Sequence, residues 1–452
     1  MIHFGHARFF ALRNWIGALA AFSFFKTNSV AMAQSDSTAN PYSSTNAATN
    51  ALSGTLNNNS APETTLEKQA LELRLGPFDL HPRLAAGLTY DDNVLLTTAN
   101  KEADTVWTIQ PAIQAVAGDD AALIAYRDQN NDILSLSPGN LIFQEADAWP
   151  GRLLILDYGP GFQFFDKYTA NNSIDEFATF NLLLPLDKLI LGIKQDYQLQ
   201  KTDQIEFDER TTVETVPTTL SAAYKFDDKT SFESDLRRVS IGYDQPGLTG
   251  YTEYNTEDWL NYAVVDNLPV SLGVLAGLDD VTGHQDQTFE QFRVRARYDY
   301  TQKLTFDVSV GGELRQFENG LPETLSSVFD IACQYQLAER TWLQLSGSRQ
   351  QYASIYNGYN YASTGATLEV RQGITDRFTV TLSAGYNSLD FTPITTTLAK
   401  YTGNYYVAEV SLDVKIVRHL TGQFFYQTVG SHSQINAAVY DNQTGIKLTL
   451  NF

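Results

Sequence analysis

The chain has very little sulfur: one cysteine and two methionines among 452 residues. A single cysteine, Cys333, cannot form an internal disulfide, so no disulfide framework holds the chain together. Tyrosine and phenylalanine are abundant by contrast, at 24 and 26 residues, and aromatic side chains favour strands over helices. The composition therefore predicts a fold rich in β-sheet.

Positive charge is also scarce. Lysine and arginine number 31 against 52 aspartates and glutamates, which gives a formal net charge of -21. A protein that binds nucleic acid needs a basic surface, so nucleic acid is not expected as a partner. The acidity is compatible with a surface that binds divalent cations or a lumen that admits cations, but solubility alone also explains it and is the favoured interpretation.

Long apolar runs are missing after the N-terminus. The one run of this kind covers residues 15–25, and the mean hydropathy of the chain is -0.24. Several membrane-spanning helices of about 20 apolar residues each are therefore excluded. If the chain resides in a membrane, it must cross with alternating strands.

The N-terminal segment predicts export. Arg8 and Arg13 precede the apolar run, and Ala31-Met32-Ala33 supplies small residues for cleavage, so residues 1–33 are expected to be a signal peptide. Residues 34–75 are mostly Asn, Ser, Thr and Ala up to about Thr65 and predict a disordered, low-complexity periplasmic arm. Between Leu66 and Leu75 the spacing of the leucines does not distinguish helix from strand.

After Leu80 the sequence alternates between apolar and polar residues in segments of about ten, which is typical of a sheet with one apolar face. The clearest segments are residues 292–300, 378–386 and 408–416. A soluble sandwich also alternates in this way, so the connections must distinguish the two folds. Short polar turns are expected near residues 227–229, 266–267, 301–303, 338–340, 375–377 and 418–419, and longer connections at 200–212, 243–255, 351–360 and 388–404.

Regular alternation of short and long connections is typical of an up-and-down barrel with periplasmic turns and extracellular loops. We therefore expect an all-β fold, a transmembrane antiparallel barrel of about 18 strands (16–18) within residues 76–452, with both ends of the barrel chain on the periplasmic side. The pattern is interrupted between Gly118 and Trp149, and parity places a periplasmic insertion at 118–150, between the second and third strands.

The C-terminal segment is the most specific motif. Ile446, Leu448 and Leu450 alternate with polar residues and end in the aromatic Phe452. Residues 445–452 are similar to the terminal strand by which the barrel-assembly machinery recognises its substrates. The expected partners are therefore outer-membrane lipids and this machinery, and the expected location is the bacterial outer membrane.

A second resemblance covers most of the mature chain. It is carried by Leu75-Gly76-Pro77-Phe78, by His81-Pro82-Arg83 and by the run from Gly87 through Tyr90-Asp91-Asp92-Asn93 to Val94. These residues resemble the first strand and loop of the β-barrel porin 2 family, outer-membrane barrels of which some are encoded in exopolysaccharide gene clusters. The resemblance implies a porin-like channel and a role in polysaccharide export. The interruption at 118–149 departs from the compact start that is usual in the family.

The polar face of the strands is expected to line a lumen, because a charged side chain on the lipid side costs roughly 2 to 4 kcal/mol at the midplane. A charge row then points inward, with cations on one strand and mostly acids on the next: Arg293, Arg295, Arg297, Asp307, Glu313 and Arg315. The row forms either a charge-selective constriction or a wall ladder in which neighbouring strands neutralise one another. Because the charges nearly balance, the ladder is favoured.

Tyrosines crowd one expected long connection: Tyr352, Tyr356, Tyr359 and Tyr361. They form either a loop that contacts glycans or the aromatic girdle at the membrane interface, and the girdle is favoured. Asp91, Asp92 and Asn93 carry oxygen ligands but lack the spacing of a dedicated calcium loop, so we expect them to form a turn.

Motifs for catalysis are missing. The sequence has no Gly-x-Ser-x-Gly, His-Glu-x-x-His, phosphate loop or cysteine cluster, so no catalytic residue, cofactor or metal ligand is predicted. No globular plug precedes the first strand, which disfavours a plugged transporter. The predicted function is a passive channel for small solutes or polysaccharide. The alternatives are a surface adhesin or receptor barrel without conduction and an outer-membrane hydrolase.

Overall fold

The protein was analysed as a computed structural model, which describes residues 73–120, 122–123, 151–204, 209–265, 267–282, 286–301, 303–318, 323–354, 358–394, 398–434 and 438–451. The described chain is almost entirely strand, apart from helical residues at 120 and 122–123 and a short 3-10 helix at Thr169–Asn171. The strands are β1 (Leu73–Leu75), β2 (Phe78–Asp91), β3 (Asp104–Gly118), β4 (Leu153–Phe165), β5 (Ser173–Leu186), β6 (Leu189–Gln204), β7 (Glu209–Lys225), β8 (Thr230–Tyr243), β9 (Tyr251–Val265), β10 (Leu268–Val281), β11 (Gln287–Thr301), β12 (Leu304–Phe317), β13 (Thr324–Ala338), β14 (Thr341–Ala353), β15 (Tyr359–Gly373), β16 (Phe378–Pro393), β17 (Tyr401–Val417), β18 (Leu420–Ser433) and β19 (Val439–Asn451).

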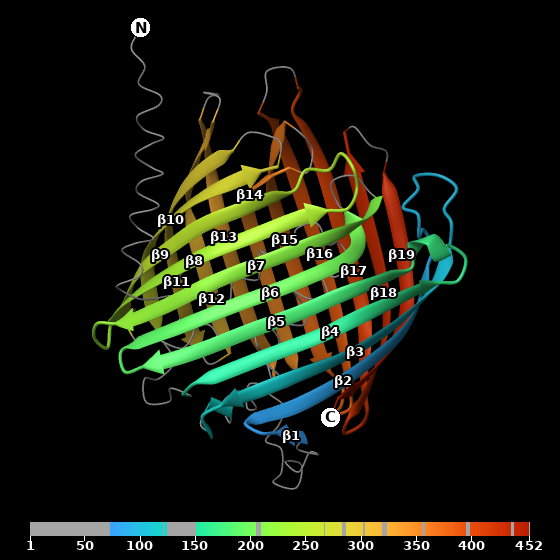
Figure 1. Ribbon diagram of the computed structural model, residues 1–452, viewed down its shortest axis with the longest axis horizontal. Coiled ribbons are helices and arrows are strands. Elements are labelled where there is room, and N and C mark those ends of the chain that lie inside the picture. Colours follow the sequence, from blue (N-terminus) through green and yellow to red (C-terminus); the bar gives the residue numbers. More distant parts are fainter. Residues whose placement is uncertain are drawn as a thin grey trace.

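Strands β2 to β19 form one closed barrel. Each strand pairs antiparallel with the next along the chain, and β19 closes on β2 over the register from Gln443–Asp91 to Asn451–Arg83. Figure 1 shows the barrel from its side, with the teal and green strands crossing in front of the orange and red ones. The short β1 folds back on β2 through a turn at Gly76, whose φ of 61° favours glycine. Strands β2 to β19 confirm the expected antiparallel barrel of about 18 strands.

The two faces of the wall differ as a membrane barrel requires. Along β11, Phe292 and Val294 are 58% and 36% exposed, while Arg293 and Arg295 between them are 3% and 5% exposed. The cross-strand registers carry this alternation around the barrel, with large apolar residues on the outside and polar residues on the inside. A closed barrel with an apolar outer band is the architecture of bacterial outer-membrane proteins. None of the described residues forms a helix long and apolar enough to cross a membrane.

The long connections are shorter than the sequence predicts. In each of the four expected segments the strands continue from both sides: β6 and β7 leave residues 205–208 between them, β8 and β9 leave 244–250, β14 and β15 leave 354–358, and β16 and β17 leave 394–400. The reason is that polar residues remain in the strand ladder beyond the apolar band, so composition alone places the strand ends too early. The connection from β2 to β3, residues 92–103, is longer than any of these four.

The predicted insertion leaves β3 after Gly118, at the end of the barrel that bears the short turns. Its first residues fold back on the wall: Asp119 accepts a hydrogen bond from the Leu123 amide, and Ala122 and Leu123 are buried. They pack with four residues of the inward-facing rows, Val116, Leu153, Ile155 and Leu183. The insertion thus begins against the lumen side of β3 to β5. Residues 124–150 lie outside the described residues, as do the predicted signal peptide and nearly all of the predicted arm.

Candidate functional site

The lumen wall carries a cluster of buried charges centred on Arg295. Its guanidinium pairs with Glu233 of β8, three strands away, and donates a hydrogen bond of 2.9 Å to Oδ1 of Asn261 on β9. The guanidinium carbon lies 4.2 Å from the ring centroid of Trp259, and Trp259 donates from Nε1 to Glu257 at 2.9 Å. The Arg295 guanidinium is therefore held by side chains of β8 and β9 and by a ring, which fixes its position in the wall.

Arg293, one step along the same row, makes a separate bridge. It pairs with Asp330 of β13 at 3.2 Å and donates a hydrogen bond of 2.9 Å to Gln350 of β14. Gln350 in turn donates to Asp330 at 2.9 Å, which closes a ring of three side chains. Arg293 thus links β11 to β13 and β14 across the inner surface of the intervening strand.

Arg315 of β12 forms the third bridge. It donates to Glu313 at 2.8 Å and to Asp279 of β10 at 2.6 Å, and all three side chains are at most 2% exposed. A further hydrogen bond of 3.0 Å reaches Gln287, and the ring centroid of Phe289 lies 4.7 Å below the guanidinium. A buried guanidinium that bonds to two carboxylates and an amide has a fixed position in the wall.

The expected pairing within the charge row differs from the observed one. Arg295 and Arg293 pair with Glu233 and Asp330, whereas the sequence predicts Asp307 and Glu313 as partners. Arg297 pairs with Asp299 of its own strand at 3.5 Å. The row does face the lumen, but a long arginine side chain reaches past its neighbouring strand, and alternation along one strand does not reveal that reach. The residues that sequence reasoning missed are Glu233, Asn261, Asp279, Gln287 and Asp330, whose only signal is their inward register.

Acidic side chains remain in excess on the inner face. After the three bridges are counted, no ion pair within the described chain involves Asp235, Glu257, Glu369 or Glu409. Registers with Glu233, Ser383 and other inward residues place all four in the inward rows of β8, β9, β15 and β17. The lumen wall is therefore acidic overall.

The predicted tyrosine cluster lies inside the barrel. Tyr361 is 1% exposed, and its ring centroid lies 5.4 Å from that of Tyr352 and 5.3 Å from that of Phe391. Phe391 stacks on Tyr401 at 4.3 Å, and Tyr359 lies 5.3 Å from the Tyr401 ring. These positions differ from both expectations, because neither a membrane girdle nor an exposed glycan loop buries its rings in this way. Tyr356 lies outside the described residues.

Asp91, Asp92 and Asn93 stabilise the closure of the barrel. Asp92 accepts hydrogen bonds of 2.8 Å from the backbone and side-chain amides of Asn442 on β19, and it pairs with Lys101 at 3.2 Å. Partial burial opposes ionisation of Asp92, but the bonds from Asn442 and Lys101 outweigh it and hold its pKa below the ordinary value. Asn93 donates to the Tyr440 carbonyl at 2.9 Å. The expected turn therefore also connects β2 to β19 at the seam where the barrel closes. We call Asp92 and Asn93, with their bonds to β19, the clasp.

The C-terminal strand is the last strand of the wall. Ile446, Leu448 and Leu450 pair with Leu88, Ala86 and Leu84 of β2, and Ile446 and Leu448 are 43% and 44% exposed on the outer face. Phe452 lies outside the described residues. The role of this segment as an assembly signal stays a prediction.

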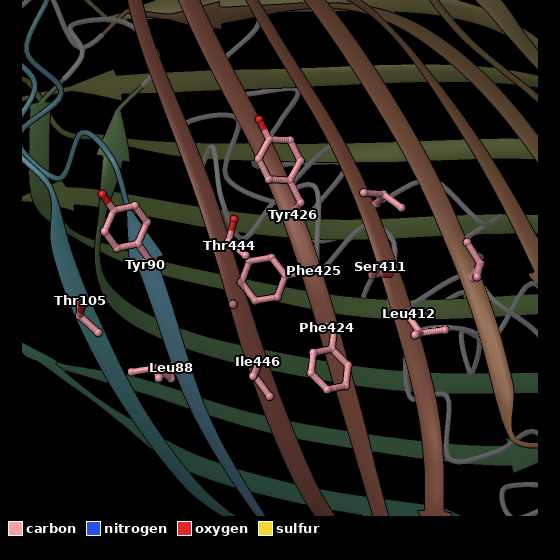
Figure 2. Close-up of a pocket in the computed structure, with 13 residues that line it drawn as sticks. Leu88, Tyr90, Thr105, Ser411, Leu412, Phe424, Phe425, Tyr426, Thr444 and Ile446 are labelled. Carbon is pink, nitrogen blue, oxygen red and sulfur yellow. The ribbon is translucent and has the colours of Figure 1, made fainter.

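A groove of about 610 Å³ crosses the same outer surface. Figure 2 shows Tyr426, Phe424, Ile446, Leu88 and Tyr90 around it, on β18, β19 and β2. Tyr426 and Tyr90 form its rims because the residue between them in the register is the small Thr444. The groove belongs to the lipid-facing surface of the barrel, not to its lumen. Among the described residues, no group of histidine, cysteine and acidic side chains is arranged to hold a metal ion.

No family model and no curated protein sequence matches the chain. Solved structures with a similar fold include OccAB4 of Acinetobacter baumannii, at 7% identity, with 82% of this chain and 98% of that chain covered and a TM-score of 0.44. OccK2 (OpdF) of Pseudomonas aeruginosa, solved in complex with glucuronate, has 8% identity, coverage of 83% and 98% and a TM-score of 0.45. The siderophore receptor PirA of Pseudomonas aeruginosa has 9% identity, coverage of 82% and 80% and a TM-score of 0.41. A likeness at this level concerns the barrel architecture only.

Proposed function

We propose that the protein is a passive outer-membrane channel for small hydrophilic solutes, with a preference for cations. The observation that carries the proposal is the contrast between the two faces of the closed barrel, apolar outside and polar inside. An 18-stranded barrel is wide enough to enclose a water-filled lumen, whereas a barrel of about eight strands is filled by its own side chains. An adhesin without conduction does not require a charged inner wall.

The preference for cations follows from the fixed charge. Arg293, Arg295 and Arg315 are neutralised by paired acids, while Asp235, Glu257 and other inward carboxylates form no ion pair within the described residues. Fixed charge in a narrow aqueous path selects ions of the opposite sign. Polysaccharide export rests on the sequence resemblance alone, and the long acidic wall favours small cationic or neutral solutes.

The test is conduction by the purified protein in planar bilayers across a potassium chloride gradient. We expect discrete channels whose reversal potential has the sign of cation preference, and liposomes containing the protein should swell in small neutral sugars. The complete absence of conduction and swelling, with the barrel folded, would favour the adhesin or receptor alternative. A reversal potential with the sign of anion preference would be consistent with the channel function but would contradict the preference for cations.

A further inference from the structure

The apolar outer surface of the barrel contains a polar region on four neighbouring strands, β6 to β9. Its residues lie in the outward rows and are Gln195, Thr218, Ser234, Thr256 and Asp258. The register fixes their side of the wall, because Asp258 lies opposite Val274 of β10, which is 52% exposed on the outer face. We call these five residues the polar patch.

Asp258 occupies the middle of the lipid-facing part of β9. The outward row of β9 contains Tyr254, Thr256, Asp258, Leu260 and Tyr262, and its two tyrosines are 43% and 50% exposed. Tyrosines gather at the two membrane interfaces, so a residue midway between them lies near the centre of the bilayer. A carboxyl group at that depth is costly in lipid, and an ionisable residue there commonly marks a contact or a function.

The carboxylate of Asp258 has only hydroxyl partners within the chain. It accepts a hydrogen bond of 3.4 Å from Thr256 and another from the Ser234 hydroxyl. It forms no ion pair within the described residues, and no cation contributes to its electrostatic environment. A carboxylate offers about four lone-pair sites, so Asp258 retains acceptor capacity for a donor outside this chain. Lipid tails supply no such donor.

The centre of the polar patch is complementary to itself. Ser234 and Asp258 lie directly opposite each other in the register of β8 and β9, and one is a donor while the other is an acceptor. Copies of one barrel insert with the same orientation, so two of them can meet by rotation about the membrane normal. Such a two-fold contact sets each residue opposite its counterpart's neighbour. An axis between β8 and β9 therefore places Ser234 of each copy opposite Asp258 of the other.

The surroundings of this pair allow a close approach. Ala222 of β7 and Ala276 of β10 lie in the outward rows on its two sides. Small side chains let two membrane segments come near each other, as contacts between polar groups in lipid require. Leu236 and Leu260, at 40% and 49% exposure, extend the surface with apolar side chains. The region thus has a polar centre and an apolar border.

We propose that the polar patch is the contact between two copies of this chain in the outer membrane. In this two-fold dimer, Asp258 of each copy accepts a hydrogen bond from Ser234 of the other. The physical reason is that a second copy supplies the donor that lipid lacks and removes the carboxyl group from the lipid. The dimer depends on the membrane location and not on conduction through the lumen.

The first experiment measures self-association of the full-length protein, extracted from outer membranes in mild detergent, by analytical ultracentrifugation. Asp258→Leu should lower the association constant about tenfold, because both symmetric hydrogen bonds are lost. The matched control is Thr444→Leu, which replaces a polar residue by leucine in the outward row of β19, away from β8 and β9. Its association constant should equal that of the unmodified protein, and heat-modifiable migration shows that each variant is folded.

The second experiment does not require a substitution of Asp258. In a Cys333→Ala background, Ser234→Cys lies beside the proposed axis, so a short bifunctional thiol reagent should link two copies in isolated outer membranes. Thr444→Cys, on the outer face of β19, is the control and should give no linked pair.

Three results would overturn the dimer, and none of them concerns the channel. If the unmodified protein is monomeric and Ser234→Cys gives no linked product, the polar patch faces lipid. If Asp258→Leu associates as strongly as the unmodified protein, copies meet through another face. If Ser234→Cys is linked to a chain of different mass, the polar patch binds a different protein.

Discussion

At the scale of single residues, the inner wall is stabilised by charges that are paired at long range. Arg295 and Glu233 are 5% and 1% exposed at their side chains, whereas Arg297 and Asp299 are 42% and 43% exposed. Removal of one partner of a buried pair leaves an uncompensated charge and costs about 3–5 kcal/mol, while an exposed pair contributes about 0–1 kcal/mol. Arg295 and Arg297 lie in the same inward row of β11, but only Arg295 is expected to stabilise the fold strongly.

The first prediction compares these two arginines. Arg295→Ser should lower the free energy of unfolding by about 3–5 kcal/mol, because Glu233 remains buried without its partner. Arg297→Ser should change it by less than about 1 kcal/mol. Denaturant unfolding of the refolded barrel, followed by heat-modifiable migration, measures both. Equal effects of the two substitutions would show that the pair with Glu233 does not stabilise the wall.

A second residue-scale prediction concerns selectivity. Arg293 and Arg295 have acidic partners on other strands and are nearly inaccessible, so they project little field into the lumen. We expect Arg295→Ser combined with Glu233→Gln, which removes both charges of one pair, to leave the ratio of cation to anion permeability unchanged. A clear shift in the reversal potential would place this pair in the conducting path.

At the scale of elements, two segments at opposite ends of the chain meet at the seam between β19 and β2. The seam has nine register pairs in the wall, from Gln443–Asp91 to Asn451–Arg83, and the clasp of Asp92 and Asn93 extends it at the extracellular end. A strand pair that closes a barrel is formed by residues distant in sequence, so side-chain contacts at its end help to fix the register.

The clasp should respond to acid. A carboxyl whose pKa is lowered in the folded protein contributes stability above its ordinary pKa of about 3.9, and that contribution is lost as the pH falls through the lowered value. Amide exchange of residues 92–101, corrected for intrinsic rates, should therefore accelerate in acid. The Asp92→Asn variant should exchange faster already at neutral pH and show a weaker acid dependence. Identical pH profiles for the two proteins would contradict this role.

The C-terminal strand carries a prediction about assembly. If residues 445–452 are the signal that the barrel-assembly machinery reads, Phe452→Asp should reduce the amount of folded barrel in cells several-fold without affecting conduction by molecules that do fold. Asn451→Asp introduces the same charge one position away and is the control. Equal assembly of both variants would remove the terminal-strand argument.

At the scale of the whole molecule, the barrel combines an apolar exterior with a lumen whose wall is polar. Its outer face carries exposed residues such as Leu272, Val274 and Phe292, at 51%, 52% and 58% exposure. In water this surface would aggregate. In a bilayer its apolar side chains contact the lipid tails instead of water. The exterior thus requires a membrane.

The corresponding prediction is a location. After gentle lysis the mature protein should be recovered with the outer membrane, and its migration should change on heating because a closed barrel resists detergent until it unfolds. Recovery in the soluble periplasm would be incompatible with the exposed apolar band.

The sequence alone determined the strands, the two faces of the wall and the number of strands. These features have a period of two residues or follow from local turn chemistry, so a segment such as residues 292–300 reveals that its arginines share a face. The sequence placed the ends of the strands poorly, because the polar residues at 200–204 and 388–393 remain in the ladder above the apolar band.

The tertiary structure alone decided which residues meet inside the lumen. Arg295 and Glu233 are 62 positions apart and belong to strands that are not neighbours, and Gln287 and Asn360 are 73 positions apart. Barrel closure brings such residues together, and no local periodicity encodes it. The same reason explains the tyrosines: their alternation predicts a face, but only the register of β14 to β16 and the burial of Tyr361 show that the face is turned into the lumen.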